Sequence, residues 1–280
     1  MKIIGLSLIA LLMVINVGAQ KLHLNLFAGV SNYSGDLQDK RFTLSQSNFA
    51  GGIGASYDLS DHIAVRSGIT FASLSANDKY GRNALRNLNF TSRLMEINAG
   101  VEYYITPLGT HSLTPYVFGG IALYHFDPYT RDTSSTKYYL EPLSTEGEGF
   151  IDGKNNYNLT QFAIPFGAGV KLSLSDNVNV GMELGYRKLF TDYIDDVSGN
   201  FVDQSILFAN RGSKAVELAF RGDELKNGSS YPPAGTVRGS AKKDWYYFAG
   251  FTASFRLFTG NGLGSGSGRH SKYGCPVNVQ

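Results

Sequence analysis

Residues 161–190 form one predicted hairpin in which apolar side chains alternate with polar or small ones on both arms. The first arm carries its apolar side chains at the even positions from Phe162 to Leu174, and the second from Val178 to Tyr186. A period of two is typical of a strand with one apolar face. Both arms exceed the five or six residues usual in soluble proteins. Such strands fit a sandwich that buries the apolar face or a membrane barrel that turns it toward lipid.

Six further segments show the same period, at about 23–30, 48–57, 63–71, 92–105, 114–126 and 244–258. In the fifth strand we place Tyr116, Phe118 and Tyr124 inward, because they share a face with small residues. Together with the hairpin, these segments make eight strands, an even number as in single-chain outer-membrane barrels.

The predicted connections alternate in length along the chain. Three are short, at 58–62, 106–113 and 175–177. Four are long, at 31–47, 75–91, 127–160 and 191–243, and the last could form short helices at 205–208 and 213–220 over the barrel mouth. Short turns at one rim and long loops at the other favour a barrel over a sandwich. We predict an all-β fold, an eight-stranded antiparallel transmembrane β-barrel with long extracellular loops.

Both ends of the chain differ from the barrel. Residues 1–19 have a positive start, an apolar stretch and a small-residue cleavage site, which together predict a secretory signal peptide. The barrel would span residues 20–258, and the Gly/Ser-rich residues 259–280 would form a short, flexible tail. This topology predicts a bacterial outer-membrane protein with both termini in the periplasm.

The composition fits this prediction. The chain has 17 Tyr, 18 Phe and 33 Gly but one Cys, the balance expected of alternating strands with interfacial aromatic residues. Beyond the N-terminal segment, no run approaches the ~18 apolar residues of a transmembrane helix. A net charge of +2 is too weak to indicate a nucleic-acid partner.

Seven charged side chains are predicted to face the barrel interior: Arg66, Glu96, Glu102, Lys171, Glu183, Arg187 and Arg256. Because an eight-stranded barrel is only wide enough for side chains to fill it, these charges would pair with one another and close the interior. The alternative is a path for protons or small solutes, as in a small porin-like barrel.

Two other groups of residues could carry chemistry. His125 and Asp127 could serve a lipid-modifying enzyme with a nearby serine as nucleophile, although their spacing is not a known catalytic signature and a histidine at the rim beside a proline turn explains them more simply. The acidic residues Asp192, Asp195 and Asp196 could bind Ca²⁺, but roles in turns are favoured because the alternation of a calcium loop is incomplete. We therefore predict no enzyme activity, cofactor or metal.

Several stretches resemble the PorG-like small outer-membrane barrels of the type IX secretion system, a DUF6089-type family. They are residues 31–37, 114–128, 142–149, 161–171, 190–199 and 244–246. The sequences Pro-Leu-Ser-Thr-Glu-Gly at 142–147 and Thr-Asp-Tyr-Ile-Asp-Asp-Val at 191–197 are the most specific, because barrel periodicity alone would not produce them.

The resemblance implies a non-enzymatic part of a protein secretion and gliding machine. The barrel would sit in the outer-membrane lipids above a periplasmic ring, which is built from a lipoprotein and a soluble partner. The sequence adds Cys275, an unpaired cysteine expected in the oxidising periplasm, where a disulfide to a ring subunit could form. The candidate partner-binding residues of the tail are Arg269, Lys272, Tyr273 and Cys275.

Overall fold

The structure is a computed structural model of the 280-residue chain. It describes residues 21–38, 43, 45–108, 112–240 and 242–257. The predicted signal peptide and the predicted tail, with Arg269, Lys272, Tyr273 and Cys275, lie outside the described residues.

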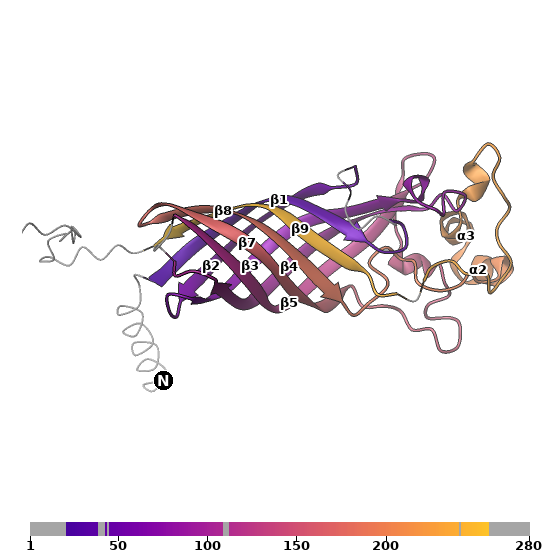
Figure 1. The fold of residues 1–280 in the computed structure, drawn as a ribbon. Coiled ribbons are helices and arrows are strands. Elements are labelled where there is room, and N and C mark those ends of the chain that lie inside the picture. The colour runs from indigo at the N-terminus through magenta and orange to yellow at the C-terminus, as the bar shows by residue number, and fades with distance from the viewer. Residues whose placement is uncertain (1–20, 39–42, 44, 109–111, 241, 258–280) are drawn as a thin grey trace, which may run out of the picture.

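Eight long antiparallel strands form a closed barrel (Figure 1). Each strand pairs with its neighbour in the chain, and β1 pairs with β9 to close the sheet. The strands are β1 (Leu22–Ser34), β2 (Asn48–Asp58), β3 (Ile63–Asn77), β4 (Asn89–Tyr104), β5 (Leu113–Arg131), β7 (Thr160–Ser175), β8 (Val178–Leu189) and β9 (Trp245–Arg256). The predicted eight-stranded barrel is confirmed.

The C-terminal part of β5 differs from the prediction. We expected this strand to end near Phe126 because Pro128 indicates a turn, but β5 continues to Arg131. Proline is tolerated here because β7 pairs with β5 only as far as His125, so the proline lies beyond that ladder. A ninth strand of three residues, β6 (Lys137–Tyr139), then takes the place beside β5, pairing with Tyr129–Arg131.

The long connections gather at one end of the barrel, and the short turns lie at the other together with the start of β1 and the end of β9 (Figure 1). The predicted loop helices are present as α2 (Gln204–Arg211) and α3 (Ser213–Ala219), separated by Gly212 with a φ of +81°. Three short 3₁₀ helices complete this end: η2 (Asp78–Tyr80), η3 (Glu141–Leu143) and η4 (Gly222–Glu224). Within the described ranges, no helix has the length and apolar character to cross a membrane.

The outer face of the barrel is apolar and exposed. Large side chains such as Ile53, Ile121 and Phe251 point away from the interior, with 53%, 67% and 67% of their surface accessible. They recur at every second residue around the whole wall. A continuous apolar surface of this size matches the lipid-facing band of an outer-membrane barrel.

Inward-facing glycines pair across neighbouring strands, and each of the eight barrel strands contributes one. The pairs are Gly29–Gly250, Gly54–Gly68, Gly100–Gly120 and Gly167–Gly185. Their backbones are so close that a Cβ on Gly120 would lie 2.2 Å from the carbonyl oxygen of Ala99. The missing side chains leave room for large inward residues: the Phe118 ring lies 2.7 Å from where a Cβ of Gly167 or of Gly185 would be.

We expect Gly120→Ala to destabilise the barrel by about 1–3 kcal/mol, because its methyl group would meet backbone that cannot move aside. The matched control is Gly119→Ala on the outer face, where the nearest atom to an added Cβ is 3.9 Å away. Denaturant unfolding in detergent, followed by heat-modifiable gel migration, measures both. Equal stability of the two variants would contradict this account of the glycine pairs.

Candidate functional site

The interior nearer the short-turn end of the barrel holds a four-residue ion-pair cluster. The Arg66 Nη1 lies 3.1 Å from a Glu102 oxygen and 2.7 Å from a Glu183 oxygen. The ammonium of Lys171 donates to the same Glu102 carboxylate. The hydroxyls of Tyr104 and Tyr116 donate to Glu102 and Glu183 at 3.0 and 2.8 Å.

A second cluster lies nearer the loop end. Glu96 is fully buried, and its carboxylate accepts two bonds from the Arg187 guanidinium, at 3.0 and 3.1 Å. The Tyr246 hydroxyl and the Asn98 amide also donate to it, at 2.7 and 3.0 Å. A bidentate pair with two further donors satisfies a buried carboxylate well. The two clusters together hold three carboxylates and three cations, so their charges balance.

Between the clusters lies a cavity of only about 10 Å³. This is near the lower limit for one water molecule. Above the second cluster, aromatic side chains fill the interior; the fully buried ones include Tyr33, Phe90, Tyr124, Phe126 and Tyr246. Within the described residues, paired charges and aromatic rings therefore occupy these levels of the interior.

Arg256, the seventh predicted interior charge, lies apart from these pairs. It stands beside His23 near the short-turn end, and its Nε is buried with no hydrogen-bond partner. His23 instead contacts Asp58, with 2.9 Å between Nε2 and the carboxylate. The structure thus brings together six of the seven predicted side chains, and Arg256 is not one of them.

The loops are tied together by a buried network, which we call the cap. At its centre Arg238 donates to Glu146 at 2.9 Å and to the carbonyl oxygen of Asp196 at 2.5 Å. Glu146 also accepts the backbone N–H groups of Ser198 and Gly199, at 3.0 and 2.8 Å. Arg86, from the loop before β4, donates to the carbonyl oxygen of Arg238. The network therefore joins four parts of the loops that are far apart in the sequence: residues 86, 146, 196–199 and 238.

A second part of the cap connects the loops to the barrel. The Tyr33 hydroxyl, at the top of β1, donates to Asp195 and lies 3.2 Å from Asp244. Asp244 also accepts the backbone N–H of Ile194 at 3.2 Å. Asp196 accepts the hydroxyls of Thr145 and Tyr157 at 2.6 and 2.8 Å.

Burial shifts the cap carboxyls toward the protonated state. It raises the pKa of Asp192 to about 7; the Asp36 and Glu146 carboxylates add to this, while Ser198 and Lys243 oppose it. Burial also raises the pKa of Asp196 to about 7, against the lowering effect of Arg238. Cap carboxyls of this kind titrate near neutral pH, unlike an exposed aspartate.

The structure places His125 on the outer wall rather than in a pocket. Its Nδ1 lies 2.9 Å from the hydroxyl of Thr160, on the neighbouring strand β7. On the neighbouring strand β4, the hydroxyl of the buried Ser92 accepts the Asp127 backbone N–H at 3.0 Å. The described contacts therefore assemble no nucleophile, base and orienting acid at His125.

The acidic run makes turn contacts. Asp195 accepts the backbone N–H of Val197 at 2.9 Å, as an aspartate in a turn does. Asp192 accepts the Ser198 hydroxyl at 2.9 Å. In the part of the chain that the structure describes, no group of three His, Cys, Asp or Glu side chains is arranged to hold a metal ion.

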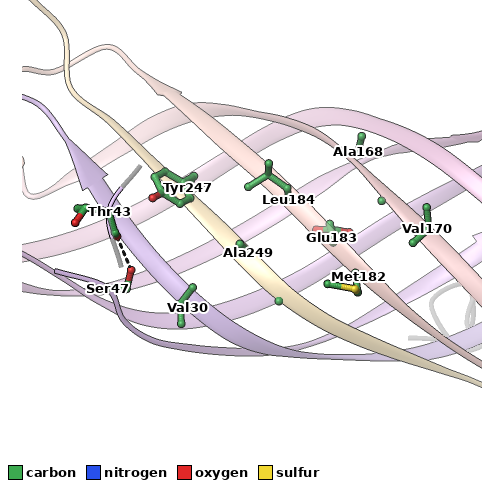
Figure 2. A pocket seen from close by; sticks show the side chains of 12 residues that line it. Val30, Thr43, Ser47, Ala168, Val170, Met182, Glu183, Leu184, Tyr247 and Ala249 are labelled. Atoms are coloured by element: carbon green, nitrogen blue, oxygen red, sulfur yellow. Dashed lines mark hydrogen bonds between the residues drawn. The ribbon is translucent and has the colours of Figure 1, made fainter. Parts of the chain in front are cut away.

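The larger hollows lie on the outside of the wall. One of about 620 Å³ is lined by Val30, Leu184, Met182 and Ala249, with Thr43 and Ser47 at one end (Figure 2). Another of about 770 Å³ adjoins it across the same strands, sharing Val170 and Met182. Most of the side chains that line them are apolar and belong to the lipid-facing surface.

Sequence reasoning missed Arg238 and Glu146, which lie 92 positions apart and form the centre of the cap. One signal was present: the stretches 142–149 and 190–199 stood out as more specific than a barrel requires. Their specificity now has a physical reason, because they supply the buried carboxylates and hydroxyls of the cap.

We expect Glu96→Gln to cost roughly 3 kcal/mol of stability, because it leaves the Arg187 guanidinium buried without a counter-charge. The double variant Glu96→Gln/Arg187→Met removes both charges and should cost clearly less than the sum of the single variants. Urea unfolding in vesicles measures this coupling. Additive costs would mean that the pair does not act as one unit.

We expect the cap to loosen as pH rises through about 7. Since the folded-state pKa of Asp192 lies above its usual 3.8, the folded cap binds more protons than the unfolded loop between these values, and its stability falls as the proton is lost. Asp192→Asn keeps an acceptor for Ser198 but carries no charge. Hydrogen exchange of residues 191–199, corrected for intrinsic rates, should therefore show more protection in the variant than in wild type at about pH 8, and a clearly smaller difference at about pH 5. A wild-type cap that exchanges alike at both values would contradict this.

None of the curated proteins matches the sequence. Among solved structures, the chain is similar to Neisserial surface protein A, with 10% identity, a TM-score of 0.43, and 84% of this chain and 97% of the other covered. It is also similar to OprG from Pseudomonas aeruginosa, with 11% identity and a TM-score of 0.42; the match covers 85% of this chain and 98% of OprG. A third similar structure is Ail, the attachment invasion locus protein of Yersinia pestis, with 8% identity and a TM-score of 0.38; the match covers 84% of this chain and 98% of Ail.

A family model described as "Domain of unknown function (DUF6089)" matches residues 2–217. The match spans most of the barrel and includes the two stretches that supply the centre of the cap, 142–149 and 190–199. Since it covers well over half of the sequence, the chain belongs to the DUF6089 family.

Proposed function

We propose that this chain is a non-enzymatic outer-membrane barrel component of the type IX protein secretion and gliding machinery, where it anchors a periplasmic ring to the outer membrane. The observation that carries the proposal is the set of stretches that resemble the PorG-like barrels. Residues 31–37, 142–149, 190–199 and 244–246 are far apart in the sequence, yet they supply Tyr33, Glu146, Asp196 and Asp244 to one cap.

The geometry of the barrel supports a scaffold better than the alternatives. A porin needs a water-filled lumen, whereas this interior is closed by paired charges and aromatic side chains. A lipid-modifying enzyme would need a nucleophile and an orienting acid hydrogen-bonded at His125, whereas the hydrogen bond described for its side chain is to Thr160.

In this proposal the loop end faces outward and the short-turn end faces the periplasm. The apolar band contacts the outer-membrane lipids. Residues 259–280 then extend into the periplasm, where Arg269, Lys272, Tyr273 and Cys275 would contact the ring lipoprotein and its soluble partner.

Affinity purification of the full-length protein from native membranes tests this role. We expect the ring subunits to co-purify with wild type and with His125→Ala, and to be lost when residues 259–280 are deleted. On non-reducing gels, a higher-mass band should collapse with reductant and be absent in Cys275→Ser.

Each outcome bears on a different part of the proposal. Purification of wild type without ring subunits would contradict the secretion role. Co-purification that survives tail deletion would move the contact to the barrel. Loss of secretion in cells that carry His125→Ala would favour the enzyme instead.

A further inference from the structure

The height of the apolar band can be read along β5. Its outward residues from Leu113 to Leu123 are apolar or glycine and proline, and His125 is the first outward residue beyond them that can carry a charge. Ten residues at ~3.3 Å each, tilted by ~40°, span about 25 Å, the height of the band in outer-membrane barrels. The next outward positions of the wall therefore lie in the headgroup layer, which is roughly 5 Å or more thick on each side.

Basic and aromatic side chains occupy these positions on β4, β5 and β6. On β4, the band residue Met95 pairs across the ladder with His125 of β5. Arg93, one outward position nearer the loop end, pairs with Asp127. Further up, Tyr129 and Arg131 of β5 pair with Tyr139 and Lys137 of β6. Cross-strand partners share a face, so all of these side chains lie on the outer wall; we call Arg93, His125, Tyr129, Arg131, Lys137 and Tyr139 the rim cluster.

The cations of the rim cluster differ from other cations of the loop end. Arg86, Lys214, Arg221 and Arg238 each pair with a carboxylate. Among the described residues, neither Arg93 nor Lys137 has a carboxylate oxygen within 4 Å. The Lys137 ammonium lies 3.9 Å from the centre of the Tyr129 ring and 4.0 Å from that of Tyr139, with its Nζ 2.7 Å from the Tyr139 hydroxyl.

One acidic residue, Asp127, stands in the middle of this surface, within electrostatic range of both Lys137 and His125. Three permanent cations, Arg93, Arg131 and Lys137, share the outer wall with this carboxylate, so the rim cluster and Asp127 together are net positive. The Arg131 guanidinium is directed back to the carbonyl oxygen of Ser135 at 2.8 Å. Arg93 and Lys137 are therefore the two cations best placed to meet an external anion.

We propose that the rim cluster binds the phosphate of an anionic membrane lipid, with the acyl chains of that lipid lying against the band below. Two observations select a lipid over other anions. The cluster continues the lipid-facing surface without a break, since Met95 and His125 are neighbours across the ladder. The exposed ring of Tyr139 and the half-buried ring of Tyr129 add the amphipathic surface typical of a membrane interface. His125, with its contact to Thr160, is then a lipid-facing residue rather than a catalytic base.

Native mass spectrometry of the full-length protein tests the site. The protein is reconstituted in vesicles of phosphatidylcholine, with or without added phosphatidylglycerol, and then extracted in mild detergent. We expect wild type to retain phosphatidylglycerol in preference to phosphatidylcholine, and Arg93→Gln/Lys137→Gln to lose about fivefold in retention for each cation removed. Lys226→Gln, an exposed lysine in the loop after η4, is the matched control and should behave as wild type.

Two further arms separate the possible explanations. Lys137→Glu, with heat-modifiable migration as the check of folding, should reduce retention further, because it reverses a charge at the same place. Inorganic phosphate added in excess should leave retention unchanged if the acyl chains contribute to binding, and displacement of the lipid by phosphate would overturn the lipid assignment. Equal retention by wild type and the double variant would overturn the lipid site. The rim cluster would then be examined as a binding surface for an acidic protein. None of these readouts depends on the secretion role.

Discussion

Pairing of β1 with β9 is the constraint on which the rest of this structure depends. In a bilayer no water is available to the backbone, so every N–H and C=O group must find a partner within the sheet, and only closure leaves no unpaired edge. With eight strands the closed sheet encloses an interior that side chains must fill. The glycine pairs follow from this, since a side chain at most of these positions would meet the backbone of the neighbouring strand. At Gly167 and Gly185, the Phe118 ring and the Arg187 guanidinium occupy the space that a side chain would need.

Charge balance follows from the same confinement. Three carboxylates meet three cations in the lower and middle interior, and tyrosine hydroxyls supply the remaining donors. Removing charges from water is costly unless each has a partner of good geometry, so the closed interior tolerates these residues only as complete clusters. The cap repeats this arrangement outside the barrel with the Arg238–Glu146 pair. One difference matters for behaviour: the cap holds more carboxyls than cations, and burial raises the pKa of Asp192 and Asp196 to about 7.

Most of the fold could be predicted because strand periodicity reports directly which face a side chain occupies. The eight strands, the inward charges and the sorting of loops by length all follow from a period of two and from the positions of turn residues. The extension of β5 past Pro128 could not be predicted, because a proline normally indicates the end of a strand and is tolerated here only where β7 has already ended. For the candidate site, the six interior residues were found from their parity, but Arg238 was not, since it lies in a long loop without a period.

The sequence by itself determined the architecture and which charged side chains face the interior. Only the tertiary structure decided the partners: Arg66 between Glu102 and Glu183, Arg187 with Glu96, and Arg238 with Glu146. These pairs join residues between 36 and 117 positions apart. Arg66 and Glu102 are diagonal neighbours on the β3–β4 ladder, whereas the other pairs meet across the interior or among the loops. Their proximity depends on strand tilt, register and closure, which are properties of the whole sheet. No local pattern in the chain encodes them, so the same alternation of residues could have specified several pairings until closure selected one.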